Sequence, residues 1–191
     1  MFVGRDGRDV VWSLFNHHAR ANEQWYATLN DTPGLVGEPM PRPPESVVEY
    51  FDTWLERDGY PLWSFWELVR SWWDIRSLPN LHFTHFAALR SDFDGEARRL
   101  AEFLGVAADS LDWGAVAQHC SFDYMKANAG KVAPLGGVFW EGGPQTFIHK
   151  GTNGRWRDLL SAEQVARYEA TATERLGEDC ARWLATGELP A

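Results

Sequence analysis

Two short apolar segments, each followed by a helical pattern, most strongly limit what this chain can fold into. Residues 1–4 are mainly apolar and end at a charged turn, and residues 81–86 alternate apolar and polar side chains. Such runs predict strands, and strands that alternate with helices favour a parallel sheet covered by helices. The sequence therefore predicts an α/β fold in a single domain over residues 1–191, which is long enough to bury a substantial core.

Helical periodicity and turn residues fill the rest of the chain. Asp9 is the expected N-cap of the first helix and Ser161 that of the last. Five prolines and two glycines make residues 29–45 an irregular loop or lid, and residues 129–151 read mostly as loop. We expect helices over about 10–26, 45–57, 63–76, 94–104, 109–119 and 162–185.

Composition excludes several classes of function. A formal net charge of −9 argues against non-specific binding to nucleic acid or to anionic membranes. No apolar run is long enough to span a bilayer, and no signal-peptide pattern is present. The two cysteines lie far apart in sequence, as expected for reduced thiols in a cytoplasmic protein. We expect no metal site, because no Cys or carboxylate cluster accompanies the histidine pairs.

Two further clusters carry residue types that bind phosphate. Residues 147–157 hold Lys150-Gly151 and a second glycine, so backbone N–H groups and an ammonium can approach an oxyanion. At the other end of the chain, Arg5 and Ser13 follow the first predicted strand, where a guanidinium and a hydroxyl can hold a phosphate dianion. From spacing alone, the alternative is that Arg5 pairs with Asp9 and Ser13 is an ordinary helix residue.

With residues 119–128 placed between them, the order and spacing of these clusters resemble the later part of the cytosolic sulfotransferases. These enzymes use 3′-phosphoadenosine 5′-phosphosulfate (PAPS), and the resemblance covers nearly the whole chain. It implies a sulfotransferase fold like that of P-loop NTPases, here with an incomplete parallel sheet. In the family an Arg after a strand and a Ser eight residues later bind the 3′-phosphate, which implies that role for Arg5 and Ser13.

The same resemblance implies contacts to the nucleotide base. Residues 119–128 are similar to the family's Thr-Ser-Phe-x-x-Met-Lys-x-Asn segment, which contacts the adenine and the 3′-phosphate. Cys120 takes the Thr position, and Phe122 and Met125 match. Phe86 stands where the family has a Tyr that lies against the nucleotide. From the residues alone, a plain core aromatic is the other interpretation of Phe86.

The glycine-containing segment 147–157 resembles the family's Phe-x-Arg-Lys-Gly-x-x-Gly-Asp-Trp-Lys. Lys150 and Gly151 match, so the resemblance implies that they bind the cofactor. His149 replaces the Arg that binds the 3′-phosphate, and Arg155 replaces the Asp. A neutral imidazole offers one donor where a guanidinium offers five, so we expect His149 to make nucleotide affinity weaker or more dependent on pH.

The activity implied is transfer of a sulfuryl group from PAPS to a hydroxyl or amine of a small acceptor, leaving 3′-phosphoadenosine 5′-phosphate (PAP). The tryptophans and the proline-rich segment suggest an apolar or aromatic acceptor. The sequence leaves the homodimer as one of the alternatives, because it matches the family's dimer-forming segment only in part. The expected acceptor pocket is lined by His17, His18, Trp63, Phe65 and Trp66.

Two parts of the family's catalytic machinery have no counterpart among residues 1–191. These are the Lys-Ser-Gly-Thr-Thr-Trp loop, and a His about twenty residues before the Arg that matches Arg5. We therefore interpret the chain as the C-terminal part of a sulfotransferase and expect it to be inactive alone. The alternative is a non-catalytic remnant that binds PAP or a partner protein. An unrelated nucleotide kinase would require Walker-type residues, which the sequence lacks.

Overall fold

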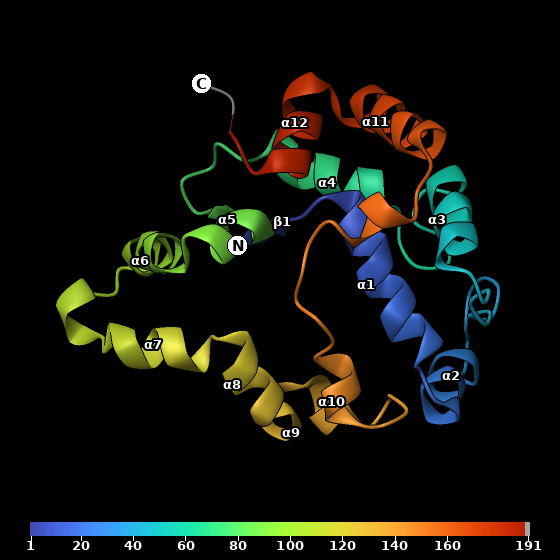
Figure 1. The fold of residues 1–191 in the computed structure, drawn as a ribbon, viewed down its shortest axis with the longest axis horizontal. Coiled ribbons are helices and arrows are strands. Elements are labelled where there is room, and N and C mark those ends of the chain that lie inside the picture. The colour runs from blue at the N-terminus through green and yellow to red at the C-terminus, as the bar shows by residue number, and fades with distance from the viewer. Residues whose placement is uncertain (190–191) are drawn as a thin grey trace.

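The computed structural model describes residues 1–189 as helices arranged around a small sheet (Figure 1). In the described chain the sheet consists of β1 (Phe2–Gly4) and β2 (Phe83–His85). The two strands are parallel, with Phe2 opposite Phe83 and Gly4 opposite His85. The predicted α/β fold with a parallel sheet flanked by helices is confirmed.

Helices provide most of the remaining regular structure. The first group comprises the helices around the sheet and the hydrophobic core: α1 (Gly7–Ala19), α2 (Glu23–Asn30), α3 (Val47–Glu56), α4 (Phe65–Asp74), α5 (Phe86–Ser91), α6 (Phe93–Phe103), α11 (Ala162–Leu176) and α12 (Glu178–Thr186). The second group is α7 (Trp113–His119), α8 (Phe122–Ala127), α9 (Ala129–Val132) and α10 (Pro144–Phe147). Three short 3₁₀ turns are η1 (Ala108–Ser110), η2 (Pro134–Gly137) and η3 (Arg155–Asp158).

Helices pack against both faces of the sheet. On one face Phe2 stacks on Trp72 of α4, with ring centroids 5.5 Å apart, and also packs against Trp183 of α12. Gly4 permits this close approach, because a Cβ there would lie 2.3 Å from the Trp183 ring. On the other face the Thr84 hydroxyl donates to the carboxylate of Glu96 in α6.

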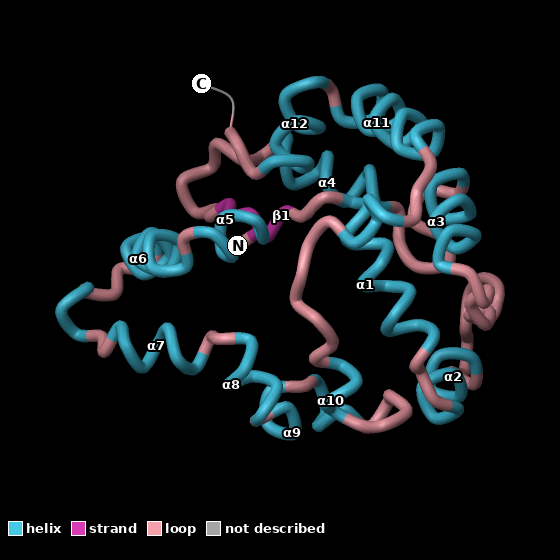
Figure 2. Tube along the Cα trace, viewed as in Figure 1, coloured by secondary structure: helices cyan, strands magenta, loops and turns pink. Residues whose placement is uncertain are grey.

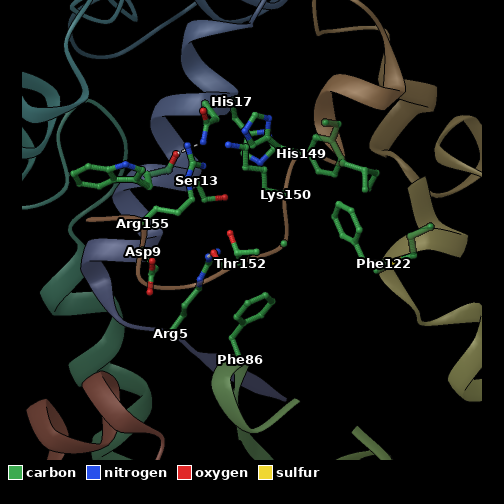
Figure 3. A pocket seen from close by; sticks show the side chains of 16 residues that line it. Arg5, Asp9, Ser13, His17, Phe86, Phe122, His149, Lys150, Thr152 and Arg155 are labelled. Carbon is green, nitrogen blue, oxygen red and sulfur yellow. Dashed lines mark hydrogen bonds between the residues drawn. The ribbon is translucent and has the colours of Figure 1, made fainter. Parts of the chain in front are cut away.

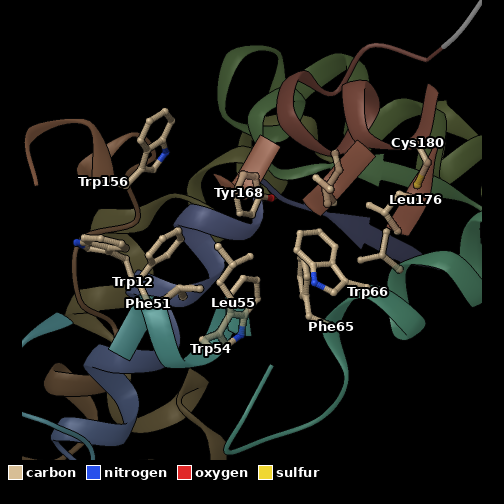
Figure 4. Close-up of a cluster of buried hydrophobic side chains, with 14 of the residues drawn as sticks. Trp12, Phe51, Trp54, Leu55, Phe65, Trp66, Trp156, Tyr168, Leu176 and Cys180 are labelled. Carbon is tan, nitrogen blue, oxygen red and sulfur yellow. The ribbon is translucent and has the colours of Figure 1, made fainter. Parts of the chain in front are cut away.

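The hydrophobic core lies among α1, α3, α4, α11 and α12 (Figure 4). Trp54 and Trp183 are among its largest fully buried side chains. Phe65 and Trp66 also belong to this core, and Trp66 packs on Tyr168. The prediction that Phe65 and Trp66 line an acceptor pocket is therefore wrong, because both rings are buried between helices.

The first predicted helix is divided in two. α1 begins earlier than expected, because the Asp6 carboxylate accepts from the backbone N–H of Arg8 and caps the helix in place of Asp9. It ends before Ala21, whose backbone forms an antiparallel bridge with Trp140. The Asn22 side chain then caps α2. A contact distant in sequence thus interrupts a segment whose local pattern is helical throughout.

The last predicted helix is also divided, at Gly177, which adopts φ 80° between α11 and α12. Ser161 caps α11 as predicted and forms a capping box with Gln164. The helix expected over 109–119 begins only at Trp113, because the Asp112 side chain caps it there. α5 was not predicted, and it begins directly at the end of β2.

Residues 113–147, which we call the arm, run as an arc away from the core (Figures 1 and 2). The arc leaves the core at α6, which contacts α7. It returns near the end of α1, where the Asn22 backbone N–H donates to the Phe139 carbonyl at 3.0 Å. Throughout residues 1–189, every helix is too short or too polar to cross a bilayer.

Candidate functional site

A cavity of about 210 Å³ lies between α1, the arm and the loop that follows α10 (Figure 3). Its lining includes eight of the nine residues that the sequence singled out: Arg5, Ser13, Phe86, Phe122, Met125, His149, Lys150 and Gly151. Arg5 and Lys150, which lie near opposite ends of the sequence, therefore meet at one cavity. The roles of these residues toward a nucleotide stay predictions.

Arg5 follows β1 and reaches across to the loop. Its Nε donates to Asn153 Oδ1 and its Nη2 to the Thr152 carbonyl, each at 3.1 Å. Its guanidinium lies 4.4 Å from the centroid of the Phe86 ring. Burial lowers the Arg5 pKa, and the neighbouring Asp9 and Asp6 oppose this. Arg5 makes no ion pair with Asp9 within residues 1–189, so the alternative of a simple Arg5–Asp9 pair is wrong.

Two charged side chains fix the loop backbone on opposite sides of the cavity. The Asp9 carboxylate of α1 accepts from the Gly154 N–H at 2.7 Å. Burial raises the pKa of Asp9, while that hydrogen bond favours its charged form. From α8, Lys126 Nζ donates to the carbonyls of Ile148 and His149, both at 3.1 Å. The loop is thereby held between the core and the arm.

Gly151 sits where the loop meets the arm. Its φ is 60°, and a Cβ at this position would lie 2.7 Å from the Phe122 ring. Only glycine therefore combines this backbone conformation with such close approach. The pairing of Lys150 with a glycine consequently has a geometric reason, because the glycine lets the loop pass against Phe122 while Lys150 lines the cavity.

The cavity carries positive charge although the whole chain is acidic. Lys150 and Arg155 line it, and neither forms an ion pair with a carboxylate in the described part of the chain. The pKa of His149 is lowered, first by burial and then by Arg155 and other nearby cations. An uncompensated cluster of this kind is suited to a polyanionic ligand.

The two adjacent histidines of α1 have different surroundings. His17 lines the cavity beside the arm, with its ring centroid 4.7 Å from that of Phe147 and 5.9 Å from that of Trp140. Burial and then His149 lower its pKa. His18 is buried on another side, where its Nε2 lies 2.8 Å from the Pro41 carbonyl. The predicted acceptor group therefore does not assemble, because Trp63 is also exposed and absent from the lining.

Cys120 is the predicted site residue that the structure does not bring to the cavity. It is exposed and lines an apolar groove formed mainly by α6 and α7. Ser121 caps α8 immediately afterwards, and the helix directs Phe122 and Met125, but not Cys120, toward the cavity. Cys120 therefore lies outside this cavity, and its role toward a nucleotide stays a prediction.

Sequence reasoning missed several residues that shape this site. Asn153 and Thr152 hold Arg5, and Asn16 lines the cavity beside Ser13. The spacing of Asn16, three residues beyond Ser13 on one helix, could have indicated this. Asn153 had no comparable signal, since its contact spans 148 residues. Residues 1–189 contain no group of three or more His, Cys, Asp or Glu side chains placed to hold a metal ion.

Comparison with known proteins identifies the family. A sequence model described as "Sulfotransferase domain" matches residues 1–179. A glycolipid sulfotransferase of Mycobacterium bovis is 27% identical over 97% of this chain and 63% of its own length. Human sulfotransferase 1C2 is 24% identical over 88% of this chain and 51% of its own length. The chain thus spans between about half and two thirds of these relatives.

Solved structures show the same fold. Mouse sulfotransferase SULT7A1, crystallised with PAP, aligns with a TM-score of 0.71 and 21% identity, covering 95% of this chain and 60% of its own. Retinol dehydratase in complex with androsterone and PAP aligns with a TM-score of 0.66 and 23% identity, covering 92% and 46%. On the match to residues 1–179, this chain belongs to the sulfotransferase domain family.

Proposed function

We propose that the cavity binds the nucleotide PAPS, or its product PAP, for sulfuryl transfer to a hydroxyl or amine of a small acceptor. One observation carries the proposal. A single cavity unites Arg5, the Ser13 hydroxyl and Lys150 with the apolar surfaces of Phe122 and Met125. Cationic groups beside a hydroxyl suit a phosphate, and an aromatic ring beside a thioether suits a purine.

The residues present fit such a nucleotide. Arg5 is half-buried, and its contacts with Asn153 and Thr152 leave guanidinium donors for a ligand. A partly desolvated guanidinium without a carboxylate partner is costly, and a phosphate dianion would compensate it. When bound, PAPS would supply the sulfuryl group. The residues of this cavity would hold and orient the nucleotide, and we assign none of them as the base.

An acceptor would fit beside His17 and Phe147, which line the cavity and are backed by Trp140. These rings favour an apolar or aromatic alcohol over a charged acceptor. The solved relative that binds androsterone, a ligand of this chemical class, supports the proposal by analogy of fold.

Calorimetry with two nucleotides tests the binding proposal. PAP and adenosine 5′-phosphosulfate differ in the 3′-phosphate, so Arg5→Ala should weaken PAP much more than adenosine 5′-phosphosulfate. Loss of a bidentate charged contact should cost about 2–3 kcal/mol. Because Arg5 also holds the loop, Ser13→Ala provides a second variant that leaves the loop contacts intact. Equal weakening of both ligands by both variants, or no PAP binding by the folded chain, would overturn the proposal.

A transfer assay tests whether residues 1–191 alone can transfer a sulfuryl group. We expect residues 1–191 to show no transfer of labelled sulfate from PAPS to phenolic acceptors, because the sequence holds no Lys-Ser-Gly-Thr-Thr-Trp-like loop. The second candidate is a non-catalytic protein of this family, which would bind PAP without transferring a sulfuryl group. Turnover by this chain would support sulfuryl transfer but contradict the expected inactivity of residues 1–191 and the non-catalytic candidate. It would direct the search for a base to His17, His18 and Lys126.

A further inference from the structure

One end of the cavity carries more positive charge than the residues around it balance. Lys150 and Arg155 lie there, and Asp9 is the acidic residue in the lining. The Asp9 carboxylate is already engaged by the Gly154 N–H at 2.7 Å. Lys150 and Arg155, like Arg5, therefore line the cavity without an ion pair to a carboxylate in residues 1–189.

The backbone positions Arg155 toward the cavity. Gly154 before it adopts a left-handed conformation with φ 81°, and its N–H is held by Asp9. Trp156 after it is buried, with the Arg8 guanidinium 3.8 Å from its ring centroid. Arg155 is thus fixed on both sides, and its side chain enters the cavity (Figure 3). Its charge acts on both Arg5 and His149, which places it near both.

His149 is exposed, and four cations lie near it. Lys150 and Arg155 belong to its own loop, Lys126 comes from α8, and Arg20 ends α1. His17 of α1 faces it as a second imidazole in the same cavity. Partial desolvation and then these four cations lower the His149 pKa, which favours the neutral ring in the absence of an anion.

We propose that Arg155 and His149 together bind one phosphate of the nucleotide, Arg155 with its permanent charge and His149 by taking up a proton as the phosphate binds. This inference rests on the proposed function. The proton comes from solvent and stays on the imidazole, and no covalent bond forms or breaks. A phosphate dianion beside the ring offsets the surrounding cations and raises the His149 pKa in the complex.

The sign of the pH dependence follows directly. The bound state holds more protons than the free state, so PAP affinity must rise as pH falls from about 8 toward 6.5, the ordinary pKa of histidine. Below this range the phosphate itself takes up a proton, with a second pKa of about 6, and its lower charge weakens binding. His149→Arg carries the charge at every pH, so the ratio of wild-type to variant affinity isolates the contribution of His149.

Calorimetry with PAP measures the proton uptake that accompanies binding. At pH 7, titrations in two buffers of different ionisation enthalpy should show net proton uptake by the wild-type chain. His149→Gln and His149→Arg should lose that uptake, while His149→Arg still binds PAP tightly. Uptake that is unchanged in His149→Gln would overturn the role of His149.

Substitutions at Arg155 test its proposed role in binding the phosphate. Arg155→Gln should weaken PAP about tenfold or more, as for loss of a charged hydrogen bond. Arg155→Lys should retain part of that affinity, which a purely structural role would not predict. Arg175→Gln, at an exposed position on α11 outside the cavity, changes net charge equally and should bind as wild type. Thermal unfolding confirms that each variant is folded.

The outcomes separate this inference from the proposed function. If wild-type PAP binding depends on Arg5 but Arg155→Gln binds normally, the Arg155 inference alone is wrong. If the folded wild-type chain binds no PAP at any pH, both the inference and the proposed function are wrong.

Discussion

The core and the arm of this molecule are built on different principles. The buried cluster lies within residues 11–73 and 156–184 and consists largely of aromatic and long aliphatic side chains. In the arm, by contrast, the buried residues of the described chain are three small ones, Ala129, Ala133 and Gly137. Burial of large apolar side chains supplies most folding free energy, so we expect stability to reside in the core.

The candidate site lies where these two regions meet. Arg5 and Ser13 come from the core, whereas Phe122 and Met125 come from the arm. The arm is attached mainly through backbone contacts near residues 20–22, including Glu141 N–H to the Arg20 carbonyl at 2.8 Å. A ligand that touches both regions would therefore add contacts where the protein itself makes few. The contrast teaches that the fold and the site depend on separate sets of residues.

The largest expected effect is on the free energy of unfolding, and a pair of tryptophans tests the contrast between buried and exposed positions. Trp54 is 1% exposed in the core, whereas Trp63 is 51% exposed. Trp54→Ala should lower the free energy of unfolding by about 3–5 kcal/mol through lost burial and a cavity. Trp63→Ala should stay within about 0.5 kcal/mol of wild type. Urea unfolding measures both, and similar values for the two variants would contradict the assignment of the core.

The second largest effect is expected on amide hydrogen exchange in the arm when a nucleotide binds. At a PAP concentration about 100 times its Kd, ligand linkage stabilises the binding-competent state by about 2.7 kcal/mol. Amides of the arm and of residues 148–155 should then exchange up to roughly a hundredfold more slowly, because their opening would release the ligand. Hydrogen exchange with and without PAP measures this. Unchanged exchange in the arm at saturation would show that the arm is not part of the site.

A smaller effect is expected at the attachment of the arm. Asn22 Nδ2 donates to the Val138 carbonyl at 2.8 Å, and its Oδ1 caps α2 by accepting from the Trp25 N–H. Asn22→Asp keeps the cap but loses the donor, at a local cost of about 1 kcal/mol. Exchange in residues 138–141 should quicken while the Tm barely changes. If global stability fell as much as in Trp54→Ala, the arm would be part of the cooperative core.

The smallest expected effect concerns pH. Burial lowers the pKa of His18 and of His85, both buried on the core side. A depressed folded-state pKa means that stability is fully present above the ordinary pKa of about 6.5 and is lost as pH falls below it. Urea unfolding at pH 7.5 and 5.5 should show this loss, and His18→Gln should reduce it. The exposed His119 of the arm gives the control, since His119→Gln should leave the slope unchanged.

The sequence predicted the parts of this molecule that depend on local chemistry. Strand positions and the Ser161 cap follow from short-range preferences, and the structure confirms them. The resemblance also placed Arg5 and Lys150 at one cavity across the length of the chain.

What the sequence could not predict depends on contacts between distant residues. The break after α1 arises where Ala21 pairs with Trp140, and no local signal marks it. Asp6 and Asp9 are equally good caps by type, and in the structure Asp6 caps α1 while the Asp9 carboxylate accepts from the distant Gly154 N–H. The motif likewise did not indicate that Cys120 lines an apolar groove apart from Phe122 and Met125.

A crystal structure of this chain with PAP tests the central claim most directly. The claim is that the core and the arm meet on one nucleotide. It predicts a phosphate within hydrogen-bond distance of Arg5 and the Ser13 hydroxyl, with the adenine against Phe122 and Met125. PAP bound in the apolar groove beside Cys120, or held by the core without contact to the arm, would contradict it.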